Sequence, residues 1–268
     1  MLAEPAKTNY DLHFTLFGVP VRVHPLFWVI TLVLAARSQK ITPPFVVIWI
    51  GVVFFSILVH EYGHALAFRY FGYEPRITLY GMGGLASADL TYAVHPPEGR
   101  RQIIICAAGP LAGFLLGGII VGLLYALGHS VAFFHWTIGR GPPIANANVD
   151  QLVFGLLFIN FLWGIVNLFP VYPLDGGQIA RELLTQRLGS AGVAKSLRLS
   201  IGVGTAAALG SLFAFDVKQG LFPALLFGSL AVMSYLLLKQ DQDGSGGDYG
   251  GGYGSGGYGG GGNGGRDW

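Results

Sequence analysis

The segment His60-Glu61-Tyr62-Gly63-His64 holds two imidazoles four residues apart, with a carboxylate beside the first. On an α-helix, His60 and His64 lie one turn apart on the same face, close enough to bind a single metal ion. Glu61 projects beside that face, where its carboxylate can accept a proton from water on the metal. The spacing therefore predicts a zinc site that performs hydrolysis.

The motif lies in an apolar stretch of the chain. Residues 44–59 contain no charged side chain, and Arg69 is the first basic residue after Glu61. Ionisable groups at membrane depth are costly and by default indicate a functional site, so a chance match is the weaker interpretation. Arg69 follows Glu61 by eight residues, roughly 12 Å at the helical rise. We therefore expect the zinc site in the bilayer, near the cytoplasmic side of a hydrocarbon core about 30 Å thick.

Several further apolar runs follow the same pattern. Of the 268 residues, 52% are hydrophobic and only 11% are charged, and the mean hydropathy is +0.55. These runs are too many and too long for one soluble core, so they predict an all-α integral membrane fold with about six transmembrane helices. The expected spans are residues 26–36, 44–68, 103–127, 152–169, 199–215 and 221–238.

The basic residues predict the orientation of these spans. With the N-terminus inside, twelve basic residues fall on the cytoplasmic side and four fall outside, namely Arg37, Lys40, Arg140 and Lys218. This bias predicts a multi-pass protein of the cell's inner (cytoplasmic) membrane with both termini in the cytoplasm. The N-terminal segment does not read as a cleavable signal peptide, so the first span is expected to act as the targeting signal. A net charge of +2 gives no reason to expect a nucleic-acid partner.

A catalytic zinc takes three protein ligands, so a third must come from elsewhere in the chain. The best carboxylate is Asp175, in the segment NLFPVYPLDGG that closes the fourth span. Its two prolines break the helix, and its two glycines permit unusual backbone angles beside the carboxylate. Asp175 could instead cap a helix over residues 178–187. Glu98 and Glu182 are the alternative downstream ligands.

The two motifs together resemble a known family. HEYGH in the second span, paired with NLFPVYPLDGG at the end of the fourth, is similar to the site-2 protease family of intramembrane zinc metalloproteases. The stretches VRVHP, LYGMGGLA and AAGPLAG look similar too, so the resemblance covers about residues 14–188. It implies one Zn2+ per chain bound by His60, His64 and Asp175, with Glu61 as catalytic base. Asn167 would then orient the substrate or the developing oxyanion.

The same resemblance implies a reaction and its partners. The expected function is hydrolysis of peptide bonds within or beside transmembrane helices of membrane-protein substrates, in regulated intramembrane proteolysis. The partners would be such a substrate and the lipid bilayer, and the sequence does not indicate an oligomeric state. The alternative is a membrane protein that keeps the fold without proteolysis, either a metal transporter or an inactive scaffold. The intact Glu61 disfavours the scaffold.

Two segments outside the spans carry further expectations. Residues 75–90 alternate and are rich in glycine, which predicts a short hairpin. The resemblance implies a membrane-associated β-loop near the zinc, whose edge could hold an unwound substrate, and a plain connector is the alternative. Asn160 is expected either to line the cleft on the same face as Asn167 or to make a hydrogen bond between helices.

The chain is expected to form one folded domain. Residues 1–13 would be an N-terminal cytoplasmic segment, residues 14–240 the polytopic membrane metalloprotease domain, and residues 241–268 a disordered tail rich in glycine and tyrosine. This leaves no room for the PDZ or nucleotide-sensing module that many relatives carry. Cys106 is the only cysteine, which excludes a disulfide and a thiolate metal cluster.

Overall fold

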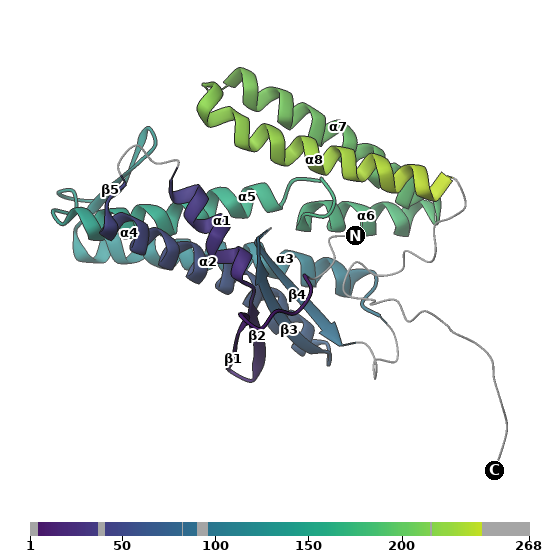
Figure 1. Ribbon diagram of the computed structural model, residues 1–268, viewed down its shortest axis with the longest axis horizontal. Helices are drawn as coiled ribbons and strands as arrows, with labels where there is room; N and C mark the ends of the chain where they lie inside the picture. Colours follow the sequence, from purple (N-terminus) through teal and green to yellow (C-terminus); the bar gives the residue numbers. More distant parts are fainter. Residues whose placement is uncertain (1–4, 37–40, 82, 90–95, 215, 243–268) are drawn as a thin grey trace, which may run out of the picture.

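The structure is a computed structural model, and it describes residues 5–36, 41–81, 83–89, 96–214 and 216–242. Most of these residues are helical. Figure 1 shows the long helices running along the longest axis of the molecule, with a small sheet on one side of them and a helical hairpin on the other. The predicted tail comprises residues 241–268, of which Asp241 and Gln242 are helical and residues 243–268 lie outside the described residues.

Five helices in the described part of the chain are long and apolar enough to cross a membrane. They are α2 (Pro43–Tyr70), α3 (Arg100–Leu127), the segment Ala147–Asn167, α7 (Ala191–Ala214) and α8 (Val217–Gln242). Each corresponds to one of the expected spans. The helix over the first expected span, α1 (Pro25–Ala35), has only 11 residues, whereas a helical span needs about 20. The count of six therefore stays a prediction.

The segment Ala147–Asn167 is not one regular helix. It consists of α4 (Ala147–Leu157), the π-helix η1 (Phe158–Trp163) and α5 (Gly164–Asn167). A π-helix pairs each residue with the fifth along the chain, so it shifts the faces of the helix that follows. Side chains before and after η1 consequently do not follow the simple spacing of an α-helix.

The fold is mostly helical as predicted, but its sheet is larger than the short β-loop expected beside an all-α fold. Four strands lie in the order β1 (Leu12–Leu16), β2 (Val19–Val23), β3 (Glu74–Tyr80) and β4 (Gly83–Asp89). The β3–β4 hairpin confirms the one predicted over residues 75–90. The strands β1 and β2 were not predicted, because each has only five residues and the pairing that joins their hairpin to the sheet, between β2 and β3, links residues far apart in the chain. Val21 of β2 pairs in parallel with Ile77 of β3.

The C-terminal half of α2 holds this sheet in place. The Tyr62 hydroxyl donates a hydrogen bond to the Leu16 carbonyl (2.6 Å). The guanidinium of Arg69 donates to the carbonyls of Phe17 (3.0 Å) and Gly18 (3.1 Å). Phe17 and Gly18 form the two-residue turn between β1 and β2, and both have positive φ, as such a hairpin turn requires. Beneath these polar contacts, Phe68 of α2 and strand side chains share a buried core.

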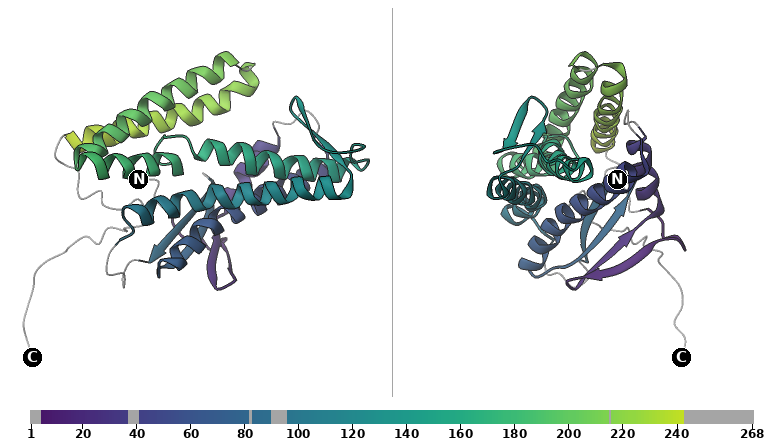
Figure 2. Two further views of the ribbon diagram at one scale, coloured as in Figure 1. Left: turned by 180° about the vertical axis from the view of Figure 1, so that it is seen from behind. Right: turned by 90° about the vertical axis from the view of Figure 1, so that its left-hand side faces the viewer.

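On the far side of the long helices, α7 packs against α8 and against α6 (Asp175–Leu188) (Figure 2). The sheet and the α7–α8 hairpin thus lie on opposite sides of the molecule, with α2 and α3 between them. A second, two-stranded hairpin, β5 (Ser130–Phe133) and β6 (Trp136–Gly139), follows α3. His24 caps α1, because its Nδ1 accepts a hydrogen bond from the Leu26 amide (3.2 Å).

Candidate metal centre

The helix α2 carries both histidines on one face, as the four-residue spacing predicts. Their rings stand edge to face, and the two Nε2 atoms lie 3.2 Å apart. The His64 side chain is 3% exposed and the His60 side chain is 12% exposed. Two buried imidazole nitrogens this close together can serve as two ligands of one metal ion.

Asp175 completes this cluster from a distant part of the chain. Its Oδ2 atom lies 3.1 Å from Nε2 of His60, and its Oδ1 atom lies 3.4 Å from Nε2 of His64. Asp175 is itself the first residue of α6, and the preceding Leu174 occupies the N-cap position. The alternative in which Asp175 caps a helix over residues 178–187 is therefore wrong, because the helix begins at Asp175 and the carboxylate faces the histidines.

The alternative carboxylate ligands lie elsewhere. The Glu182 carboxylate accepts hydrogen bonds from the backbone amide of Gly99 (2.7 Å) and from the side chain of Gln186 (3.4 Å). Glu98 is exposed. In the described residues, the only group of three or more potential ligand side chains that converge in this way is His60, His64 and Asp175, with all ligand atoms within 4.8 Å of one another.

The geometry of the cluster fits a zinc ion. Zinc–nitrogen and zinc–oxygen bonds of about 2.0–2.1 Å in a tetrahedron put neighbouring ligand atoms roughly 3.3 Å apart. The separation of the two Nε2 atoms (3.2 Å) is close to this value, and so are the distances from His60 Nε2 to Oδ2 of Asp175 (3.1 Å) and from His64 Nε2 to Oδ1 of Asp175 (3.4 Å). The other ring nitrogen of His64, Nδ1, donates to the carbonyl of Ile105 (2.7 Å). With Nδ1 protonated, the lone pair of Nε2 is directed at the cluster, which is the usual arrangement of a metal-binding histidine.

Glu61 lies on the flank of α2 that faces the sheet. It is 6% exposed. Its carboxylate fits against Gly84 of β4 so closely that a Cβ atom there would collide with it. The carboxylate also interacts with the backbone N–H of Ala86 in the same strand. In the part of the chain that the structure describes, β4 is one of the two edge strands of the sheet, so Glu61 lies beside both the metal cluster and a strand edge.

The loop before α6 explains why Asp175 is followed by two glycines. A Cβ at Gly176 would collide with the carbonyl of Leu168, and one at Gly177 would collide with the backbone of Val171 and Tyr172. Both glycines are helical, so they serve close approach of the chain, not unusual backbone angles as predicted. The side chain of Gln178 then holds the loop by donating to the Pro173 carbonyl (3.0 Å).

The family of the chain follows from comparison with known proteins. Residues 48–136 and 126–211 match the model of Peptidase family M50, which is more than half of the chain. The chain belongs to Peptidase family M50. This match confirms the resemblance to site-2 proteases. Together with the five apolar helices of spanning length, it indicates that the chain is a multi-pass membrane protein.

Relatives of this chain are named as zinc metalloproteases. A zinc metalloprotease of Methanocaldococcus jannaschii is 29% identical over 86% of this chain and 57% of its own length. A putative zinc metalloprotease of Synechocystis sp. is 30% identical over 80% of this chain and 55% of its own length. The chain thus spans about half the length of the curated relatives that it matches. The solved structure of the site-2 protease from Methanocaldococcus jannaschii has the same fold, with a TM-score of 0.53 and 23% identity over 85% of this chain and 94% of that one.

The two asparagines considered for the site differ in their surroundings. Asn160 is 3% exposed and donates from its side-chain amide to the Ser56 hydroxyl of α2 (2.9 Å) and to the Leu156 carbonyl (2.8 Å). It therefore makes the hydrogen bond between helices that was one of its two expected roles. Asn167 ends α5 and is half-buried, and its side chain makes no hydrogen bond to any described residue. The prediction that the two share a face assumed a regular α-helix, which η1 interrupts between them.

Three contacts of the site were not predicted from the sequence. His64 donates to the backbone carbonyl of Ile105, and its ring lies against Gly109 of α3, where a Cβ atom would collide with it. The third contact is that of the Glu61 carboxylate with Gly84. The stretches LYGMGGLA and AAGPLAG contain both glycines and were noticed as motifs. A glycine-rich motif predicts a close approach but does not identify the side chain that approaches.

Proposed function

We propose that this chain is an intramembrane zinc metalloprotease that hydrolyses peptide bonds within or beside the transmembrane helices of membrane-protein substrates. The observation that carries this proposal is the convergence of His60, His64 and Asp175 on an apolar helix of spanning length, with Glu61 beside them. The names of the relatives support it.

In this proposal His60, His64 and Asp175 hold one Zn2+ per chain. A zinc ion bound by three protein ligands keeps a fourth position for water or substrate, and it supplies Lewis acidity to a carbonyl oxygen and to water. The three side chains contribute by their fixed positions. His64 is held at Nδ1 by the Ile105 carbonyl, and Asp175 by the start of α6.

Glu61 moves the protons of the reaction. Its carboxylate accepts one from the attacking water as the water oxygen bonds to the scissile carbonyl carbon. The same group then delivers that proton to the nitrogen of the departing amine as the carbon–nitrogen bond breaks. Contact with Gly84 and Ala86 keeps the carboxylate from turning away. We further propose that Asn167 orients the substrate as it enters.

The edge strand β4 is the natural place to present a substrate. Peptide groups in a membrane helix are hydrogen-bonded within the helix, so the segment to be cut must first unwind. An unwound segment can pair with an open strand edge through its main chain. Because Glu61 contacts β4, a segment added there would bring its peptide bonds beside the carboxylate. Substrates whose helices contain weak helix formers are favoured.

The proposal includes the placement of the chain in its membrane. From the distribution of basic residues, both termini face the cytoplasm in the cell's inner membrane, and the cluster lies nearer that side. Regulated intramembrane proteolysis would be its physiological setting. The predicted boundaries of the metalloprotease domain, residues 14 and 240, fall inside β1 and α8, so the proposed domain includes both of these elements whole.

Metal analysis tests the ligand assignment. We expect about one zinc per chain in the purified protein. His64→Ala and Asp175→Ala should each lose most of it to a chelator, since two remaining ligands hold the ion weakly. Glu182→Ala is the matched control, because the Glu182 carboxylate is bound to the Gly99 amide and should not affect zinc. Full zinc occupancy in both His64→Ala and Asp175→Ala would rule out this site.

A further inference from the structure

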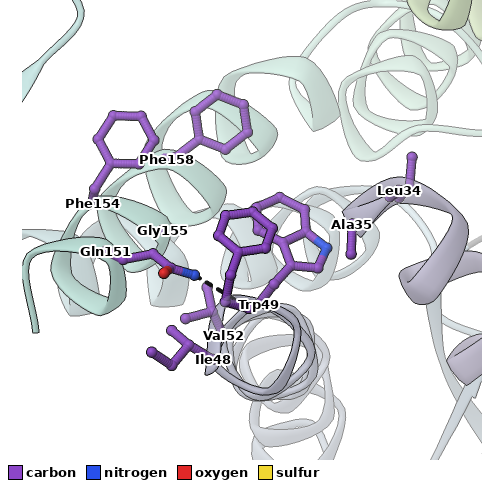
Figure 3. Close-up of a pocket in the computed structure, with 10 residues that line it drawn as sticks. Leu34, Ala35, Ile48, Trp49, Val52, Gln151, Phe154, Gly155 and Phe158 are labelled. Atoms are coloured by element: carbon purple, nitrogen blue, oxygen red, sulfur yellow. Dashed lines mark hydrogen bonds between the residues drawn. The ribbon is translucent and has the colours of Figure 1, made fainter. Parts of the chain in front are cut away.

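A pocket opens between α1, α2 and the α4–η1 segment, in the half of α2 away from the metal cluster. Its volume is about 330 Å3, within the range of about 300–1,000 Å3 typical of small-molecule sites. Figure 3 shows walls that are almost wholly apolar, with Leu34 and Ala35 of α1 on one side and the rings of Phe154 and Phe158 on the other.

The pocket contains one polar group without a partner. The indole N–H of Trp49 is buried and has no hydrogen-bond acceptor in the described part of the chain. In Figure 3 the indole nitrogen lies on the side of the ring that faces Ala35. The other polar side chain of the lining, Gln151, already donates to the Phe45 carbonyl (3.0 Å). A buried donor left unpaired in an apolar surrounding costs free energy, so Trp49 calls for an acceptor brought by a ligand.

The depth of Trp49 indicates which acceptor is available. The helix α2 has 28 residues, roughly 42 Å, which equals a whole bilayer including its headgroup regions. Trp49 is the seventh residue of α2, roughly 10 Å from its start, where the headgroup region meets the hydrocarbon core. The ester carbonyls of phospholipids lie at this level, and tryptophan is enriched there. Glu61 lies twelve residues further along α2, so the pocket is separate from the metal cluster by roughly 18 Å.

We propose that this pocket binds one acyl chain of a phospholipid, whose ester carbonyl accepts a hydrogen bond from the indole of Trp49. The apolar walls match the chain, and the indole N–H matches the carbonyl at its end. A transmembrane helix of a substrate fits less well, because its backbone carbonyls are already paired within the helix. By filling the space between α1 and the α4–η1 segment, the bound lipid holds α1 against the rest of the protein.

Native mass spectrometry of the full chain tests this site. The protein is reconstituted in vesicles of palmitoyl-oleoyl phosphatidylcholine, extracted into a mild detergent and washed. Wild type should retain one phosphatidylcholine. Trp49→Phe keeps the ring but removes the donor, and the fraction that retains lipid should fall about two- to twelve-fold, the effect of one hydrogen bond. Ala35→Phe should fill the pocket and abolish retention.

Trp28→Phe is the matched control. The Trp28 ring belongs to α1, stacks on Phe54 and does not line the pocket, so this variant should retain lipid as wild type does. Each variant is first checked for wild-type helix content and monodisperse elution, which separates loss of lipid from loss of fold. The proposal is overturned if wild type retains no phospholipid, or if Trp49→Phe and Ala35→Phe both retain it as wild type does. Displacement of the lipid by a transmembrane peptide, one for one, would assign the pocket to a substrate instead.

Discussion

Gly84 of the edge strand β4 lies directly against the carboxylate of Glu61. A Cβ atom at residue 84 would collide with Cγ, Cδ and Oε1 of that side chain. The strand and the helix therefore approach each other through a position that has no side chain. The proposed catalytic base owes its position to this gap, since its carboxylate fills the space that a side chain at residue 84 would occupy.

Gly84→Ala should consequently impair the reaction and spare the metal. The added methyl group pushes the Glu61 carboxylate aside, and a misplacement of about 1 Å can lower a rate about 100-fold. We expect cleavage of a model transmembrane helix to fall at least tenfold, with zinc content unchanged. Gly118→Ala is the control, because a Cβ at Gly118 meets open space. Wild-type cleavage by Gly84→Ala would show that this contact does not position Glu61.

Gly109→Ala should have the opposite effect on the metal. A Cβ atom at Gly109 of α3 would collide with the ring of His64 at Nε2, the atom proposed to bind zinc. The ring must then turn and weaken its bond to the Ile105 carbonyl as well. Loss of such supporting contacts typically lowers metal affinity about 10- to 100-fold. Competition with a zinc chelator measures this, and Gly122→Ala, which also faces open space, should compete as wild type does.

The part of the site that could be predicted from the sequence rests on local spacing. His60 and His64 share a helical face because four residues make one turn, and the apolar run around them predicts the membrane setting. Asp175 could be proposed because few carboxylates were available and because its motif resembles a known family. The spans were found for the same reason, since long apolar runs need no knowledge of distant partners.

The parts that could not be predicted depend on residues far apart in the chain. The strand β2 pairs with β3 across more than fifty residues, and neither its five residues nor those of β1 carry enough pattern to predict a strand. Sequence spacing placed Asn160 and Asn167 on one face, but the π-helix η1 shifts the register between them. The contacts of Gly84 and Gly109 follow from tertiary packing, which sequence spacing does not encode.

The N-terminal segment is fixed to the sheet by a buried ion pair. Nε of Arg22 lies 2.7 Å from Oδ2 of Asp11, whose side chain is fully buried. Burial alone would raise the pKa of Asp11, but hydrogen bonds from the side chain and backbone of Thr8 and from Arg22 outweigh it. The pKa of Asp11 is therefore held well below its usual value, and the ionised carboxylate stabilises the folded segment.

This pair should make the β1–β2 region sensitive to acid. A carboxyl group whose pKa is lowered by folding contributes its stabilisation above the unfolded pKa of about 3.9 and loses it as the pH falls towards the folded value. We expect amide hydrogen exchange in β1 and β2, corrected for its intrinsic pH dependence, to lose protection between about pH 4 and pH 2. Asp11→Asn should be less protected at pH 7 and lack this transition, whereas Glu74→Gln, which alters an exposed carboxyl of β3, should retain it.

The central claim of the proposed function is that the protein cleaves membrane helices in a reaction that needs the Glu61 carboxylate. The measurement compares wild type with Glu61→Gln, both reconstituted in vesicles with a model transmembrane helix, and determines zinc content and the masses of the cleavage products. The amide of glutamine has the size of the carboxylate but cannot accept a proton from water. We expect Glu61→Gln to keep its zinc and to cleave about 10²- to 10⁴-fold more slowly. Cleavage by Glu61→Gln at the wild-type rate, or a wild-type protein that binds zinc and cuts no membrane helix, would contradict the account.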